Sequence, residues 1–168
     1  SQALSAAGRL DEAEQYIHRV LKKHPHRADA LRQLASIYGE LKRHQHAINL
    51  LEMAARHSQD QATHAGIFFD MGKNFRDLKL LANATQCFQK AIKLQPDLTE
   101  AHHNLGVIYH MQGEHKKAAQ HYTVAKRLNP EDPLLQENLD KLHKSMQPQQ
   151  QQQQQPQKTN KQRTLNNI

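Results

Sequence analysis

The stretch TEAHHNLGVIYHMQGEHKKAAQHYTVAKRLNPED, from Thr99 to Asp132, decides the fold of this chain of 168 residues. Large and small residues stand in it at fixed positions: His102, Leu105, Gly106, Tyr109, Ala118, Tyr122, Ala125 and Pro130. Small residues let two helices cross closely, large ones fill the space beside them, and a proline stops the second helix. The stretch therefore predicts a hairpin of two helices.

Three further copies of this pattern precede it. The nearest copy has Phe68, Met71, Gly72, Phe75, Ala84, Phe88, Ala91 and Pro96. The next has Leu31, Leu34, Ala35, Tyr38, Ala47, Leu51 and Ala54, with Gln59 in place of the proline. The first copy is partial, with Gly8 expected at the turn between helices, followed by Ala13, Ile17, Val20 and Pro25. The chain resembles the tetratricopeptide repeat, a helix–turn–helix unit of 34 residues, which implies an all-α solenoid.

The repeat spacing divides the chain. We expect a partial repeat at 1–27, full repeats at 28–61, 65–98 and 99–132, a capping helix at 133–146, and a disordered tail at 147–168. Residues 25, 59, 96 and 130 end the repeats, so the middle step is three residues longer than the others. The insertion falls between about Ser58 and His64, in an expected inter-repeat turn. Because the chain starts within a repeat, we expect it to be a piece of a longer protein.

The last predicted helix has the features of a solenoid cap. Asp132-Pro133 supplies an N-cap and a first-turn proline. Leu135, Leu139, Leu142 and Met146 then form one apolar stripe, which would cover the last repeat. Beyond it, Gln149 to Gln155 are all glutamine, a low-complexity segment that predicts disorder.

Charge and composition favour a scaffold over an enzyme or a nucleic-acid binder. The net charge is +7, but Lys158, Lys161 and Arg163 in the tail supply three of these charges. The basic and acidic residues of the repeats alternate, and tryptophan is absent, so we expect no nucleic-acid binding. No apolar run has membrane-spanning length, and no phosphate-binding loop or hydrolytic triad is recognisable. We expect a non-enzymatic segment without a cofactor.

Thirteen histidines raise the alternative of a metal site. The densest group is His102, His103, His110, His115 and His121, but it has no paired spacing typical of zinc ligands. We therefore expect no metal site, with the metal- or nucleic-acid-binding repeat kept as an alternative. The single cysteine, Cys87, is expected to pack as a small apolar residue.

In this repeat class the first helix of each hairpin lines a concave groove that binds a protein or peptide. The resemblance implies groove positions at Arg32, Ser36, Gly39, Phe69, Lys73, Arg76, His103, Asn104, Val107 and His110. Phe69 is expected in the groove because Phe68 and Phe69 cannot both be buried on one helix face. The sequence carries no signal for oligomeric state.

Two groove types of this repeat family can be compared with the sequence. A clamp for a terminal carboxylate would use Arg32, Ser36, Glu100 and Asn104, and Glu100 would repel the carboxylate. A ladder of asparagines that holds peptide backbone would use Gln33, Asp70 and Asn104, where one asparagine is present. Both types are therefore disfavoured.

The segment from Ala91 to His143 resembles the C-terminal end of the transmembrane and tetratricopeptide-repeat-containing proteins. That resemblance implies a repeat array in the endoplasmic reticulum lumen, attached to a membrane-anchored O-mannosyltransferase that acts on cadherins. This segment itself would contact no membrane and hold no catalytic residue. The sequon at Asn83 agrees with a lumenal location. The alternative is a scaffold in a soluble cytosolic or nuclear complex.

Overall fold

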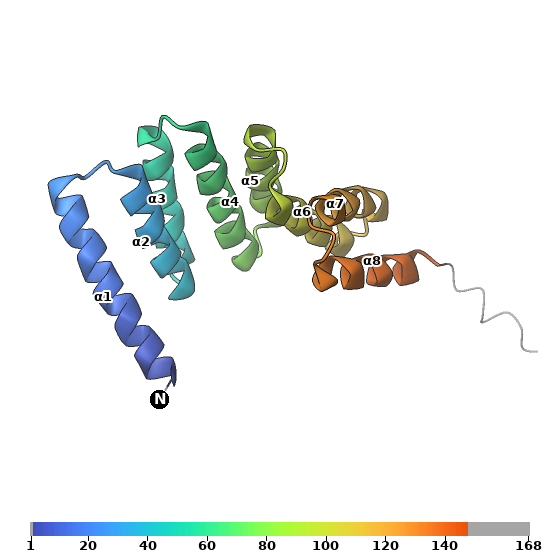
Figure 1. The fold of residues 1–168 in the computed structure, drawn as a ribbon, viewed down its shortest axis with the longest axis horizontal. Coiled ribbons are helices and arrows are strands. Elements are labelled where there is room, and N and C mark those ends of the chain that lie inside the picture. Colours follow the sequence, from blue (N-terminus) through green and yellow to red (C-terminus); the bar gives the residue numbers. More distant parts are fainter. Residues whose placement is uncertain (1, 148–168) are drawn as a thin grey trace, which may run out of the picture.

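The computed structural model describes residues 2–147, with side chains from residue 11 onward, as a row of helices joined by short turns (Figure 1). The helices are α1 (Gln2–Lys23), α2 (Ala28–Glu40), α3 (His44–His57), α4 (Gln61–Asp77), α5 (Leu81–Leu94), α6 (Thr99–Met111), α7 (His115–Leu128) and α8 (Pro133–Met146). Each helix packs on its neighbours in the chain. Successive helices also rotate, so α1 to α5 stand upright in Figure 1 while α7 is seen nearly end-on. The predicted all-α solenoid is confirmed.

The first helix differs from its prediction. A turn was expected at Gly8, but α1 continues through it as one helix from Gln2 to Lys23. Residues 2–7 are rich in alanine, with leucine and glutamine, which favour helix strongly enough to carry the helix across one glycine.

The three inserted residues lengthen a helix rather than a turn. Helix α4 has 17 residues, against 13 in α2 and 13 in α6. Its additional turn lies at its start, where the Asp60 carboxylate accepts a hydrogen bond from the Thr63 amide at 2.7 Å. A capped N-terminus stabilises the first turn, so the insertion at the predicted place is helical. The expectation of a longer inter-repeat turn was wrong.

The close crossings predicted within each hairpin are present. A Cβ added at Gly72 would lie 2.7 Å from the Phe88 ring, and one added at Gly106 would lie 2.5 Å from the Tyr122 ring. Ala47, Ala84 and Ala118 are 0% exposed. These small residues therefore let each second helix approach its first helix, and the ring of the second helix occupies the space where a side chain would stand.

The turns inside the hairpins share one backbone conformation. Lys42, Lys79 and Gly113 occupy equivalent positions and have φ of 60°, 63° and 75°. Only glycine adopts this left-handed region without steric cost. The sequence pattern shows the need for it at Gly113, whereas the two lysines accept it because the helices on both sides fix the turn.

The capping helix α8 is confirmed. The Asp132 side chain accepts a hydrogen bond from the Leu134 amide at 2.9 Å, and Leu135 and Leu142 are 0% exposed. Met146 was expected on the same buried stripe, but it is 46% exposed in the last turn of α8. The predicted glutamine-rich tail lies outside the described residues, apart from Gln147.

Cys87 is buried in the core beside α3 and α4, as predicted, and burial raises the pKa of its thiol. Among residues 2–147, the structure has no helix that is both long and apolar enough to cross a membrane.

Candidate peptide-binding groove

The inner face of the array is formed by the first helices of successive hairpins. Helices α2 and α4 contact each other directly, as do α6 and α8, so this side is the closed side of the curved row. The predicted groove residues lie on it in three sets, from α2, α4 and α6. Ser36 is exposed and Asn104 is 8% exposed, whereas the other predicted groove residues are half-buried.

Arg32 and Lys73 converge on one carboxylate. Arg32 Nε donates to Asp70 Oδ2 at 2.6 Å, and Lys73 Nζ lies 3.0 Å from Asp70 Oδ1. The Asp70 side chain is 16% exposed, so the ion pairs are partly shielded from water. A Cβ at Gly66 would lie 2.6 Å from Arg32 Cζ. The glycine therefore makes room for the guanidinium to cross α4.

Arg76 repeats this link one hairpin further on. One of its terminal nitrogens donates to the Asn104 side-chain oxygen, and Nε and the other terminal nitrogen contact Asp77 Oδ1 at 3.3 and 3.1 Å. The Asn104 amide donates in turn to the Glu100 carbonyl at 2.7 Å. The Asn104 side chain is thus engaged on both sides by the protein itself.

His103 makes the third link, to the capping helix. The Asn138 amide donates to His103 Nε2 at 2.8 Å. Burial lowers the pKa of His103, an effect that nearby Asp132 opposes and Arg76 adds to. A neutral imidazole can accept this hydrogen bond, so the pKa direction and the contact agree. His110 lies near α8 as well, 3.4 Å from the Ser145 hydroxyl.

Asp70, Asn104 and Asn138 stand at equivalent places in successive repeats, and we call them the rung residues. Each is contacted by a basic residue of the preceding first helix: Arg32, Arg76 and His103. Of the three rung residues, the sequence analysis names Asp70 and Asn104. It misses Asn138 because it predicts only an apolar stripe for the capping helix. The signal was available, since Asn138 follows Asn104 by 34 residues and also precedes a leucine.

The two phenylalanines of α4 are both half-buried. The Phe69 ring centroid lies 5.7 Å from that of Phe88, and Lys73 Nζ lies 5.2 Å from the Phe69 centroid. Phe68 packs between two core clusters, with Lys90 Nζ 5.2 Å from its ring centroid. Phe69 is therefore the one on the side of Lys73, although it also packs on the core.

The histidines are spread over separate partners. His102 Nδ1 and His121 Nδ1 are 3.2 Å apart, and His102 Nε2 lies 3.0 Å from the Pro96 carbonyl. Because a carbonyl only accepts, His102 Nε2 carries the proton, and His121 Nδ1–H donates to His102 Nδ1. Within the part of the chain that the structure describes, no three His, Cys, Asp or Glu side chains are arranged to hold a metal ion.

This histidine pair gives a pH-dependent stability. Burial lowers the pKa of His121 below 6.5, and His102 lowers it further. The unfolded chain therefore binds more protons than the folded one as pH falls below about 6.5, and the free energy of unfolding should fall with it. Urea unfolding at pH 7 and pH 5 measures this. We expect H121Q to flatten the dependence, while H143Q, which removes an exposed imidazole of α8, should leave it as it is. An equal slope in all three proteins would contradict the assignment.

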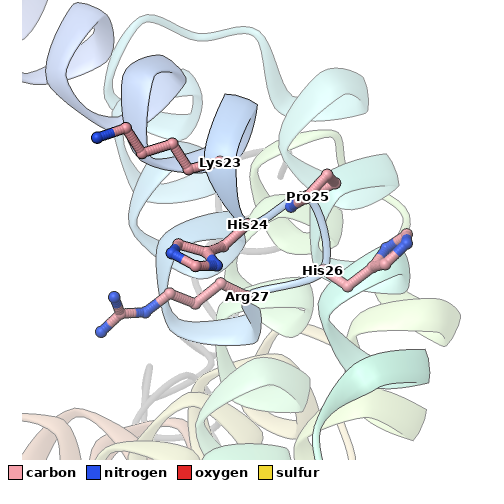
Figure 2. A pocket seen from close by; sticks show the side chains of 5 residues that line it. All are labelled: Lys23, His24, Pro25, His26 and Arg27. Carbon is pink, nitrogen blue, oxygen red and sulfur yellow. The ribbon is translucent and has the colours of Figure 1, made fainter.

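Two further surface features lie outside the groove. Asn83 is exposed in the first turn of α5, so the sequon is helical in the folded chain, and Ala84 within it is buried. A shallow pocket at the turn between α1 and α2 is lined by Lys23, His24, Pro25, His26 and Arg27. Figure 2 shows their side chains pointing in different directions, and all five are exposed, so this pocket is not a binding site built by several helices.

Comparison with known proteins agrees with the fold. Models of the tetratricopeptide repeat match residues 4–66, 72–113 and 99–132. Among solved structures, MamA superposes with a TM-score of 0.73 at 23% identity, covering 84% of this chain and 81% of MamA. The first repeat domain of RPAP3 bound to the HSP90 peptide SRMEEVD gives a TM-score of 0.66 at 18% identity, covering 71% of this chain and 92% of that domain. At such identities the likeness shows the fold alone.

Similarity in sequence extends to one group of enzymes. Protein O-mannosyl-transferase TMTC1 of Mus musculus is 32% identical over 143 residues, and that of Homo sapiens is 30% identical over the same length. TMTC2 of Homo sapiens is 36% identical over 74 residues. The match covers 84% of this chain but only 15% and 16% of the two TMTC1 proteins. The chain is a tetratricopeptide repeat protein, a scaffold for protein interactions related to part of the protein O-mannosyl-transferases TMTC1 and TMTC2.

Proposed function

We propose that the inner face binds a segment of a partner polypeptide, in extended or helical form. The observation that carries the proposal is the row of inner side chains that α2, α4, α6 and α8 hold in register. Arg32 and Lys73 keep 39% and 42% of their side chains exposed beside an Asp70 carboxylate that is only 16% exposed, and Arg76, which contacts Asp77 and Asn104, keeps 37% exposed. A ligand would meet these cations first, with the exposed Ser36 beside them on α2.

The rung residues define what kind of contact this groove would make. In an asparagine ladder the amide side chains hydrogen-bond to the backbone of the ligand. Here Asn104 and Asn138 already contact Arg76 and His103. A ligand would have to displace those contacts or bind beside them, so we propose recognition of ligand side chains by Ser36, Phe69, Lys73, Val107 and His110.

We further propose that this array is the partner-binding part of a protein O-mannosyltransferase, located in the endoplasmic reticulum lumen. The identity of 32% to TMTC1 over 143 residues supports this proposal. The segment itself would be non-catalytic and would need no cofactor. Its role would be to hold the acceptor polypeptide, for which a cadherin ectodomain is the candidate, or a protein that delivers it.

A binding experiment with matched variants tests the groove. The groove variant S36W/K73A changes two inner-face residues, and the control N49W/K22A makes comparable changes at exposed positions of α3 and α1. We expect calorimetric titration with a recombinant cadherin ectodomain to show a dissociation constant about tenfold higher for the groove variant, because a tryptophan side chain in the groove would block several contacts. The control should bind as the unchanged protein does.

Circular dichroism must show the same helix content in all three proteins. Equal binding by the groove variant would place the ligand elsewhere on the array. Absence of any binding to the ectodomain would contradict the assignment of a cadherin ectodomain as the directly bound acceptor.

A further inference from the structure

Basic residues are unevenly distributed over the outer side of the array. Helices α5 and α7 together carry six lysines and arginines and no acidic residue: Lys90, Lys93, Lys116, Lys117, Lys126 and Arg127. The rest of the chain up to Gln147 carries fourteen basic and sixteen acidic side chains. The positive charge of the repeats is therefore concentrated on these two helices, which are second helices of their hairpins and lie opposite the groove.

Five of these cations are exposed, and we call Lys90, Lys93, Lys116, Lys117 and Arg127 the basic face. Lys126 is excluded because it is half-buried and donates to the Pro130 carbonyl. On α7 the exposed positions Lys116, Gln120, Thr123 and Arg127 recur at helical spacing along one stripe. On α5, Lys90 and Lys93 are three residues apart and share one side.

The two halves of the basic face are joined through α6, which lies between α5 and α7 (Figure 1). Gln89 of α5 donates to the Tyr109 hydroxyl at 3.0 Å, and Lys117 Nζ of α7 lies 5.4 Å from the Tyr109 ring centroid. Tyr109 thus touches both helices. Only one acidic contact is present on this surface among the described residues, between Glu114 and Lys117 at 3.3 Å.

The chemistry of the basic face points to one class of partner. Four of its five cations are lysines, which as point charges attract carboxylates and phosphates alike, without the bidentate geometry that arginine offers to either. Its aromatic residues offer little free ring face to a base, since Tyr122 and Phe88 are buried, Tyr109 is stacked by His121, and the half-buried Phe68 has Lys90 over its ring. No large apolar side chain is exposed on α5, and on α7 only Leu128 is, at its end, which disfavours a lipid surface.

We propose that the basic face is a second interaction surface, separate from the groove, that binds an acidic segment of a polypeptide. Attraction would be long-ranged and would fall as salt concentration rises, because exposed charges are screened beyond about 10 Å at 0.1 M salt. One array could then engage two segments at once, one on each side of the helices.

Fluorescence anisotropy with a labelled peptide tests this proposal. The probe is a flexible peptide of about 20 residues in which half are Glu or Asp, and its neutral counterpart carries Gln and Asn at those positions. The face variant is K90Q/K93Q/K116Q/R127Q. The matched control K22Q/K23Q/R43Q/K144Q removes the same number of exposed charges elsewhere. Each variant also removes one cation that lies over an aromatic ring: Lys90 is 5.2 Å from the Phe68 centroid, and Arg43 is 5.7 Å from the Tyr38 centroid.

At about 50 mM salt we expect the face variant to bind the acidic peptide roughly tenfold more weakly, because four exposed charges that each contribute a small attraction are removed. The control variant and the groove variant S36W/K73A should change affinity by less than about twofold. Equal losses in the face and control variants would reduce the effect to net charge and overturn the proposal. Loss in the groove variant alone would assign the acidic peptide to the groove.

Two further probes separate the classes of partner. A single-stranded oligonucleotide and vesicles containing phosphatidylserine are titrated under the same conditions. The proposal holds if the acidic peptide binds and these probes bind no more tightly. It fails if either probe binds while the acidic peptide does not, or if the neutral peptide binds as well as the acidic one.

Discussion

Replacing Tyr122 by alanine should lower the free energy of unfolding by about 3–5 kcal/mol, the usual cost of removing a large ring from a core. Tyr122 is 1% exposed and lies over Gly106, in a cluster with Ala118, Ala125 and Leu135 of the last hairpin and cap. Removing the ring would leave a cavity, because Gly106 opposite it has no side chain to fill the space. Urea unfolding followed by circular dichroism measures the loss.

Tyr16 offers a matched control, since it is 61% exposed on α1. The same change to alanine there should alter stability by no more than about 0.5 kcal/mol. Burial raises the pKa of Tyr122 to about 12, so the ring is neutral throughout the working pH range, and Y122F should retain most of the stability. If Y122A and Y16A cost the same, the described packing of the last hairpin is wrong.

The second large effect is expected from an added side chain. Ala118 is 0% exposed where α7 crosses α6, and its replacement by leucine should destabilise the protein by about 1–3 kcal/mol through overpacking. The three additional carbon atoms would have to push α7 away from α6 or force Tyr122 off its place over Gly106. Thermal or urea unfolding of A118L measures the cost.

Ala82 provides the comparison because it is an exposed alanine of α5. A82L adds the same atoms to a helix without meeting a neighbour, and its stability should stay within about 0.5 kcal/mol of the unchanged protein. An unchanged melting temperature for A118L would mean that the repeat register assigned to residues 99–132 is shifted.

The sequence predicted the hairpins well because their determinants are local and recur at a fixed period. Gly106 and Ala118 identify a close crossing by their size alone, and the structure places the Tyr122 ring in the space they leave. The prediction at Gly8 failed because a glycine alone does not end a helix, and the alanine-rich residues before it support helix through that position.

The groove was harder to predict because its contacts join different repeats. The contact between Arg32 of α2 and Asp70 of α4 depends on Gly66, which also lies on α4 but is not a position of the repeat signature. The basic face has the same origin. Lysines of α5 and α7 are far apart in the sequence, and the stacking of the hairpins brings the two helices to Tyr109, which contacts Gln89 of α5 and lies under Lys117 of α7.

The rung contacts also bear on the mechanics of the array. Three contacts connect the inner edges of neighbouring first helices: Arg32 to Asp70, Arg76 to Asn104 and His103 to Asn138. Because these contacts lie on the concave side of the solenoid, straightening the array would break them, whereas further bending would not. One of these contacts is an ion pair and another includes a histidine, so ionic strength and pH would change the flexibility of the array. A bound segment that displaced one rung residue would make the array more flexible only at that repeat.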